Sequence, residues 1–395
     1  MPIIALGASL RFHHLGNNGL WIDEAFSVWM GRQPVGQMLG WLARIDQHPP
    51  LYYLMLHLWM RLGDGEAVVR ALSALCATLT IPAIYLLGRR LAGRGVGLLA
   101  ALILAVSPFH VYFAQEARMY ALLALNASLA LLALARLLTD PRAVTQTLGR
   151  QLVDFWREWR TTRRRPPLRA IETDLAWLAY VVFTAATLLT HNTAVFLPLA
   201  ANLFILGLFT VRCALSPLCP LVPLSLHLPS LCNWLLAQAG VLLLWSPWLP
   251  AFISQSMDVY REFWLPAPTL ETVAGTVGAF VGGLLPLPLP AVCVLGVLCT
   301  ALVLLGLFHF RREPARAALL LVFFATPILG EWLVSLWRPI FYERTLIWAS
   351  LPLYVLLAAG ICGLSPQRRK ERKGFMGKSQ KTPPLAVGMN GKAGD

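Results

Sequence analysis

Residues 120–138 read YALLALNASLALLALARLL, a run of 19 residues that contains a single charge, Arg136. This length matches the ~20 residues that an α-helix needs to cross a bilayer. Similar runs recur along most of the 395-residue chain, of which 57% is hydrophobic and only 13% is charged. Soluble domains carry about 25% charged residues, and the sequence lacks the alternating pattern of an outer-membrane barrel. It therefore predicts an all-α polytopic membrane protein.

We expect about ten transmembrane helices, with apolar periodicity and flanking charges as the guide. Their predicted positions are residues 1–13, 67–88, 95–112, 120–138, 174–190, 193–212, 233–251, 290–309, 316–337 and 345–363. The first run is short for a crossing, which indicates either a tilted half-helix or a start codon assigned too late. The proline-rich segment 213–231 is too broken for a span, and we expect it to form a connector along the membrane.

The net charge of +14 is concentrated beside the predicted spans. Residues 140–172 hold eight arginines against four acids, and residues 366–395 hold eight Lys/Arg against two acids. Residues 14–66, by contrast, hold three arginines and five acids. Because basic loops stay in the cytoplasm, both termini are predicted inside and residues 14–66 outside. This distribution argues for a membrane topology signal and against a nucleic-acid partner.

These features divide the chain into a membrane-embedded unit and a tail. The unit covers residues 1–365, with an extracytoplasmic first loop at 14–66 and a cytoplasmic basic insert at 139–172, while the basic tail 366–395 is predicted to be cytoplasmic and disordered. Within the first loop, His48–Trp59 is too short for a span. We expect it to be a juxtamembrane helix on the outer surface, with Tyr52, Tyr53 and Trp59 as interfacial anchors.

The seven cysteines form no CxxC pair, and most lie in apolar runs. Cysteine in such surroundings behaves as a small buried hydrophobe. The sequence therefore predicts neither a disulfide framework nor a zinc site.

Two acids, Asp23 and Glu24, lie just outside the first apolar run. One interpretation is structural, because such residues favour the first turn of a helix. The other is chemical: a carboxylate at the membrane surface can take a proton from a hydroxyl nucleophile as a general base.

Further charged groups fall at the same predicted face. Glu116 and Arg118 could form a surface ion pair, or Arg118 could present its planar fork to a phosphate. Asp46 and His48 could lie in an ordinary loop, hold a metal ion or contact an acceptor hydroxyl, and His191 could cap a helix or belong to a site.

Two more groups lie near the predicted outer ends of the last spans. Glu343 and Arg344 form a second acid–arginine pair in the sequence, and Glu331 lies within an apolar run. An ionisable group at membrane depth is a functional candidate.

Several short motifs follow one another along the chain. They are Trp21-x-Asp-Glu-Ala-x-Ser27, Asp46-x-His-Pro-Pro-Leu-Tyr-Tyr53, Arg70-x-x-Ser73, Gly88-Arg-Arg-Leu91, Ser107-Pro-Phe109, Gln115-Glu-Ala-Arg-Met-Tyr120, His191-Asn192 and Phe341-Tyr-Glu-Arg344. In their order and spacing they resemble the C-type integral-membrane glycosyltransferases, in particular the bacterial dolichyl-phosphate-mannose-protein mannosyltransferase-like and aminoarabinose transferase-like proteins. The resemblance is dense over residues 10–200 and looser over 240–360. The basic insert, the proline-rich connector and the short first span depart from the family pattern.

The resemblance implies an enzyme of the cell (inner) membrane that takes a sugar from a polyprenyl-phosphate carrier. It would pass the sugar, with inversion, to a protein, lipid or glycan acceptor at the extracytoplasmic face. Asp23 would be the base with Glu24 shaping the pocket, and Arg118, helped by Arg344, would bind the donor phosphate. The remaining expected site residues, which would contact the acceptor or shape the site, are Asp46, His48, Glu116, Tyr120 and His191.

Members of this family differ in metal dependence, so a divalent metal stays open and no other cofactor is implied. The rival class is a transporter or flippase of a lipid-linked saccharide, which would explain the apolar bundle and Glu331. It would also predict internal repeats, which the sequence does not show. A purely structural membrane scaffold is a third alternative.

Overall fold

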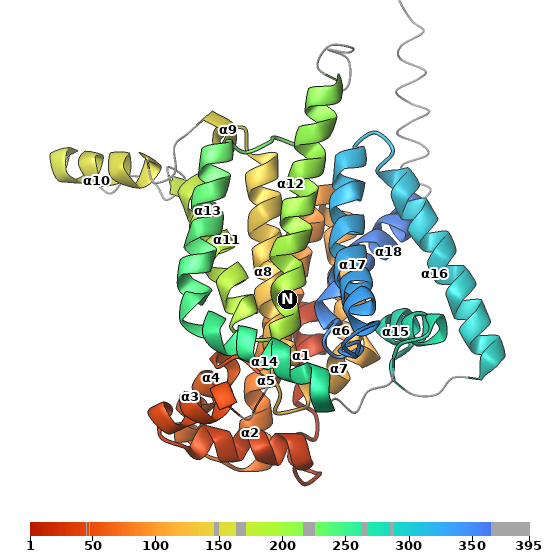
Figure 1. Cartoon of the computed structure of the whole chain (residues 1–395). Helices are drawn as coiled ribbons and strands as arrows, with labels where there is room; N and C mark the ends of the chain where they lie inside the picture. Colours follow the sequence, from red (N-terminus) through yellow and green to blue (C-terminus); the bar gives the residue numbers. More distant parts are fainter. Residues whose placement is uncertain are drawn as a thin grey trace, which may run out of the picture.

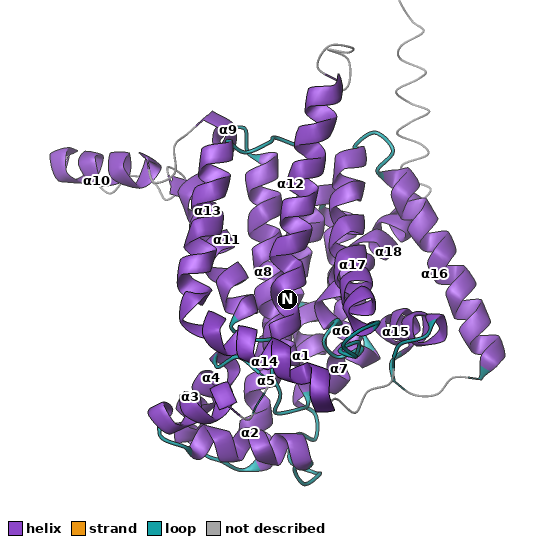
Figure 2. Cartoon of the chain, viewed as in Figure 1, coloured by secondary structure: helices purple, strands orange, loops and turns teal. Residues whose placement is uncertain are grey.

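The structure, a computed structural model, describes residues 1–44, 46, 48–145, 150–162, 171–215, 226–262, 267–284 and 288–364. These residues form helices joined by short loops, and no strand occurs among them (Figure 2). The helices are α1 (Pro2–Phe12), α2 (Ile22–Arg32), α3 (Val35–Arg44), α4 (Leu51–Trp59), α5 (Glu66–Ala92), α6 (Arg94–Val106), α7 (Pro108–Ala114), α8 (Tyr120–Thr139), α9 (Arg142–Thr145), α10 (Arg150–Thr162), α11 (Glu172–Leu188), α12 (Phe196–Leu215), α13 (Leu231–Trp245), α14 (Leu249–Glu262), α15 (Leu270–Gly282), α16 (Leu289–His309), α17 (Pro314–Ser335) and α18 (Ser350–Leu364).

Seven helical segments are long and apolar enough to cross a membrane, and the bent pair α6–α7 would be an eighth. They are Glu66–Ala92, Tyr120–Thr139, Asn192–Ala214, Leu231–Met257, Leu289–His309, Pro314–Ser335 and Ile347–Leu364. The predicted all-α polytopic membrane protein is thereby confirmed. The count of ten spans stays a prediction, because α1 has 11 residues and α11 has 17.

The hairpin of α5 and α6 is closed by glycines. Gly93, between the two helices, has a φ of +94°, which side chains other than glycine rarely adopt. Below the turn, a Cβ atom on Gly88 would lie 2.9 Å from the Cα of Gly97. The two helices approach this closely because neither residue has a side chain at the crossing.

A break at Ser107-Pro108 bends the chain by 58° between α6 and α7. Proline cannot continue the hydrogen-bond ladder of α6, so the last carbonyls of this helix need other donors. Arg11, fully buried on α1, donates to the carbonyls of Ala105 and Leu104 at 2.8 Å each. The only charged residue of the first predicted span therefore caps a broken helix.

Helices α2, α3 and α4 gather at one end of the bundle, and α9 and α10 lie at the opposite end (Figure 1). The predicted juxtamembrane helix is α4, but Tyr52 and Tyr53 are not interfacial anchors. Both side chains are fully buried: the Tyr52 hydroxyl lies 3.1 Å from that of Ser73, and the Tyr53 hydroxyl accepts from Arg118 at 3.4 Å. Their hydroxyls satisfy polar groups inside the protein.

Three predictions fall wholly or partly outside the described residues. These are the disordered tail at 366–395, the parts of the basic insert at 146–149 and 163–170, and the part of the proline-rich connector at 216–225.

The contact between α16 and α18 gives a prediction about packing. A Cβ atom on Gly360 would collide with the Leu302 carbonyl, whereas Gly296 on α16 has no neighbour within 4 Å. We expect Gly360→Ala to destabilise the protein by about 1–3 kcal/mol, because the helices must move apart. The measurement is thermal unfolding in detergent, with Gly296→Ala as the matched control. Equal melting temperatures for the two variants would contradict the close helix crossing.

Candidate functional site

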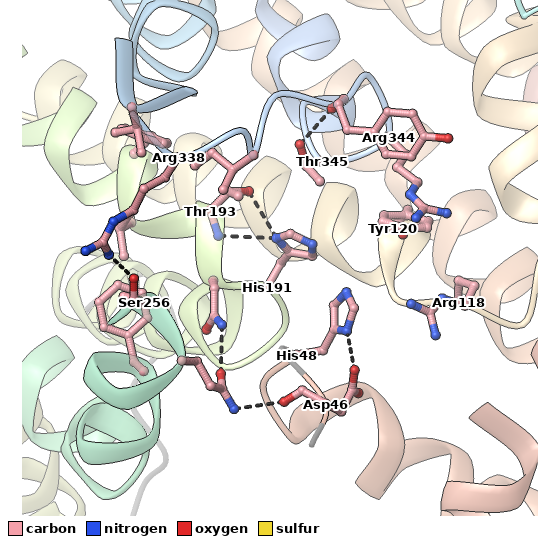
Figure 3. Close-up of a pocket in the computed structure, with 18 of the residues that line it drawn as sticks. Asp46, His48, Arg118, Tyr120, His191, Thr193, Ser256, Arg338, Arg344 and Thr345 are labelled. Carbon is pink, nitrogen blue, oxygen red and sulfur yellow. Dashed lines mark hydrogen bonds and ion pairs between the residues drawn. The ribbon is translucent and has the colours of Figure 1, made fainter. Parts of the chain in front are cut away.

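A cavity of about 590 Å³ is enclosed by residues from α2, the loop before α4, the start of α8, and the C-terminal segments around α14 and α17 (Figure 3). Seven of the nine predicted site residues line it, namely Asp23, Asp46, His48, Arg118, Tyr120, His191 and Arg344. Glu24 and Glu116 do not line it. Segments more than 300 residues apart in sequence thus contribute to one site.

Glu24 is a structural carboxylate, although it adjoins Asp23 in the sequence. It is fully buried, and its two oxygens accept from Nε and Nη2 of Arg70 at 2.8 and 2.6 Å. The same carboxylate accepts from the backbone N–H groups of Ala117, at 2.8 Å, and Trp21, at 3.3 Å. The helix-capping interpretation therefore describes Glu24, with Trp21 at the N-cap position.

Arg70 also holds the chain that leads into α2. Its Nη1 donates to the carbonyls of Leu15 and Asn18, both at 2.8 Å, and its Nη2 donates to the carbonyl of Gly19 at 3.0 Å. Because Arg70 lies on the long helix α5, these bonds fix the N-terminal end of α2 against the bundle. The orientation of Asp23 follows from this attachment.

Asp23 faces the cavity and remains accessible. Its side chain is 31% exposed and lies 3.3 Å from Nη1 of Arg344. The guanidinium of Arg344 stacks over the rings of Tyr342, at 4.4 Å, and Tyr120, at 5.3 Å. Two aromatic faces and one carboxylate therefore position this cation at the wall of the cavity.

Arg118 is buried below the cavity wall. Its Nη1 donates to the Asp23 carbonyl at 3.3 Å and to the Ser27 hydroxyl at 3.2 Å, while its Nε has no partner among the residues that the structure describes. Burial lowers the pKa of Arg118, but the neighbouring tyrosines and carboxylates outweigh this and raise it. Arg118 is therefore a permanent cation, and it lines the cavity.

Asp46 and His48 form a pair in which Nδ1 of His48 lies 2.8 Å from Oδ1 of Asp46. Burial raises the pKa of Asp46, but His48 and Tyr53 outweigh it and hold the pKa below its usual value. Gln255 fixes the backbone of this loop by donating to the Asp46 carbonyl at 2.9 Å. Asp46 is thus an ionised carboxylate at the cavity wall.

His191 faces the ring of His48, with the centroids 5.4 Å apart. Its Nδ1 accepts from the backbone N–H of Thr193 at 3.2 Å, so Nδ1 carries the lone pair and the proton of the neutral ring lies on Nε2. Burial, together with the nearby His48 and Arg118, lowers the pKa of His191 well below its usual value. His191 is therefore a neutral hydrogen-bond donor.

No group of three or more His, Cys, Asp or Glu side chains suited to a metal ion occurs within the described ranges. Asp46 and His48, the predicted candidates for metal ligation, hydrogen-bond to each other.

Arg70, Gln255 and Arg338 are charged or polar residues of the site to which the sequence prediction assigned no role. Arg70 was signalled by a charge inside an apolar run and by its place in the Arg70-x-x-Ser73 motif. Gln255 and Arg338, which both line the cavity, are single polar residues with no distinguishing pattern. Gln255 donates through Nε2 to the carbonyl of Leu42 at 2.8 Å. Arg338 donates through Nη1 to the carbonyl of Ser256.

Glu116 yields a prediction about pH and stability. Burial and the adjacent charge of Glu24 raise its pKa from 4.5 to about 7. The folded protein thus keeps this proton up to about pH 7 while the unfolded chain releases it near pH 4.5, so rising pH between these values favours unfolding. The full decrease in the free energy of unfolding is about 3 kcal/mol.

Thermal unfolding of the detergent-solubilised protein between pH 5 and 8 measures this effect. We expect Glu116→Gln, which cannot ionise, to lose less stability than the wild type over that interval. Parallel pH profiles for the two proteins would show that Glu116 ionises normally.

Comparison with known proteins gives one match in sequence. Residues 47–149 match the model of the family described as dolichyl-phosphate-mannose-protein mannosyltransferase. No curated protein matches the chain.

Solved structures match the fold over almost the whole chain. ArnT from Cupriavidus metallidurans bound to undecaprenyl phosphate aligns with a TM-score of 0.60 and 17% identity, over 96% of this chain and 62% of the ArnT chain. The archaeal oligosaccharyltransferase AglB from Archaeoglobus fulgidus, in complex with an inhibitory peptide and a dolichol-phosphate, aligns with a TM-score of 0.53 and 10% identity, over 98% of this chain and 52% of that chain.

The chain therefore spans less than two thirds of the length of these proteins, and at such identities the likeness concerns the fold. The match of residues 47–149 to the mannosyltransferase family and the ArnT-like fold confirm the predicted resemblance to the C-type integral-membrane glycosyltransferases.

Proposed function

We propose that this protein transfers a sugar from a polyprenyl-phosphate-linked donor to an acceptor, with inversion, at the extracytoplasmic face of the membrane. The observation that carries the proposal is the cavity in which Asp23 lies between two arginines at the end of an apolar helix bundle. The two structural relatives were solved with a polyprenyl phosphate or a dolichol-phosphate, which supports a lipid phosphate as the donor carrier.

Arg118 and Arg344 are suited to the phosphate of the donor. A guanidinium binds phosphate oxygens through two parallel hydrogen bonds, and stabilising the charge of the departing phosphate lowers the barrier to transfer. Arg344 is paired with Asp23 in the present structure. The donor phosphate, a diester with one negative charge, would compete with Asp23 for Arg344, and its charge would grow as the phosphate leaves the sugar.

Asp23 is the proposed general base. It would take the proton from the acceptor hydroxyl while the phosphate leaves from the opposite side of the sugar carbon, which gives inversion. Glu24 is the positioning residue, since its buried pair with Arg70 sets the start of α2. Asp46, His48 and His191 form the neighbouring wall, where the acceptor would be held.

The lipid part of the donor requires an apolar surface next to the phosphate site. Phe26, Val195, Phe196, Phe252 and Val334 supply this surface within the same cavity. An isoprenoid chain could therefore leave the site along apolar side chains toward the membrane.

Charge distribution supports the proposed sidedness in the cell membrane. The insert that begins at Asp140 includes α9 and α10, which lie at the end of the bundle opposite α2 (Figure 1). Arg90, Arg136 and Arg142 line a second, polar cavity at that end. Because basic residues flanking spans remain cytoplasmic, the cavity with Asp23 would face outward.

The role of Arg118 can be tested by a change that retains its charge. Arg118→Lys loses the planar fork, so we expect transfer to fall and the dissociation constant for undecaprenyl phosphate to rise, by about tenfold or more. Arg32→Lys is the matched control, because Arg32 forms an exposed ion pair with Asp64. Wild-type turnover and affinity in Arg118→Ala would contradict a phosphate-binding role.

The catalytic role of Asp23 is tested by sugar transfer in membranes, with radiolabelled polyprenyl-phosphate mannose and aminoarabinose as donors. Asp23→Asn is nearly isosteric and removes the proton acceptor, so we expect turnover at saturating donor to fall about 10²–10⁴-fold. Undecaprenyl phosphate should still bind, because both arginines remain.

Glu24→Gln separates the two neighbouring acids. We expect a lower melting temperature, since Arg70 loses its charged partner, and a milder loss of turnover per folded molecule. Full turnover in both Asp23→Asn and Glu24→Gln would contradict the proposal that Asp23 is the general base. Donor movement across the membrane without sugar transfer would favour the transporter alternative.

A further inference from the structure

Glu331 is a buried carboxyl that the proposed mechanism does not use. It lies on α17 and is fully buried behind the cavity wall. A carboxyl group at membrane depth is costly and is retained where it has a function. Its polar neighbours are the hydroxyl groups of Thr345 and Thr193 and the backbone of Tyr342, and both threonines line the cavity.

The hydrogen bonds of Thr345 indicate the protonation state of Glu331. The Thr345 hydroxyl lies 2.7 Å from Oε2 of Glu331 and 2.7 Å from the carbonyl oxygen of Tyr342. A hydroxyl has one proton to donate, and a carbonyl can only accept. Both contacts are satisfied if Thr345 donates to Tyr342 and a protonated Glu331 donates to Thr345.

The surroundings of the carboxyl agree with this arrangement. Glu331 forms no ion pair with a cation in the described part of the chain, and its Oε1 has no hydrogen-bond partner there. An unpaired carboxylate in such a place would carry a large desolvation cost. A neutral acid carries much less.

We propose that Glu331, as a neutral carboxylic acid, is a positioning residue that holds the cavity wall carrying Arg344. This inference rests on the proposed function, because it assigns Arg344 to the donor phosphate. The link is short: Glu331 donates to Thr345, and Thr345 directly follows Arg344 in the chain. Tyr342, which accepts the Thr345 proton, also stacks on Arg344.

The second hydroxyl neighbour connects Glu331 to the other side of the site. Thr193 lies beside Glu331 and holds Nδ1 of His191 through its backbone N–H at 3.2 Å and its hydroxyl at 3.0 Å. Figure 3 shows Thr193 and Thr345 on neighbouring parts of the wall, next to His191 and Arg344 respectively. Glu331 therefore lies between the segment that carries Arg344, the proposed phosphate ligand, and the segment that carries His191, a neutral hydrogen-bond donor.

The experiment compares two replacements of Glu331 in the full-length protein. Glu331→Gln keeps a neutral group with an N–H donor, whereas Glu331→Leu has a similar size and no donor. We expect the dissociation constant for undecaprenyl phosphate to stay within about twofold for Gln and to rise about tenfold for Leu. Thr80→Val is the control, because Thr80 is buried on α5, bonds only its own helix and does not line the cavity.

Thr345→Val tests the same link from its other end. Its effect on affinity should match that of Glu331→Leu, and the double variant should show no further loss, because both changes break one chain of contacts. This variant also serves if Glu331→Leu fails to fold. If the losses of affinity from Glu331→Leu and Thr345→Val add up in the double variant, the proposed link through Thr345 is wrong.

Infrared spectroscopy gives a readout that a general packing role would not produce. At pH 7, where an exposed glutamate is ionised, the wild type should show a protonated-carboxyl C=O band that is missing in Glu331→Gln. Absence of this band, or equal damage by Gln and Leu, would show that Glu331 acts as a carboxylate. Wild-type affinity in Glu331→Leu would also overturn the proposal.

Failure of the proposed function gives a different result. In that case the wild type itself would neither bind undecaprenyl phosphate nor transfer sugar. The infrared band and the coupling between Glu331→Leu and Thr345→Val in thermal unfolding would still decide whether the neutral acid holds this wall.

Discussion

The buried ion pair between Glu24 and Arg70 is the interaction on which the rest of the site depends. It joins the start of α2 to the long helix α5, and the same carboxylate binds the backbone at Ala117, next to Arg118. Removing one partner of such a pair costs about 3–5 kcal/mol, because the other charge is left buried and alone. The pair thus constrains the two segments that carry Asp23 and Arg118.

Two neighbouring acids therefore differ in what surrounds them. Glu24 points into the protein, where four donors satisfy it, and it has no capacity left for a substrate. Asp23 points into the cavity, with one arginine as its partner. A carboxylate that is held in place but only partly satisfied is suited to take a proton, and its fixed neighbour supplies the rigidity that positioning requires.

The sequence was sufficient to predict the fold class, and seven of the nine predicted site residues line one cavity, but the roles of these residues stay predictions. Long apolar runs determine helices in a bilayer directly, so most helices were predicted. The orientation of Tyr52 and Tyr53 was wrong, because an aromatic pair near a membrane boundary serves equally as a lipid anchor or as a buried hydroxyl donor. Arg70 and Gln255 act through backbone carbonyls, which the sequence does not locate in space.

The separation of the site residues along the chain has a consequence for biosynthesis. Asp23 and Arg344 lie 321 residues apart, while Glu24 and Arg70 lie 46 apart. During synthesis the Glu24–Arg70 pair becomes available long before the Asp23–Arg344 pair, and long-range contacts form only after their loop-closure cost is met. The N-terminal helices can thus assemble before the cavity exists, and the site is completed only when the last segments of the chain have been inserted.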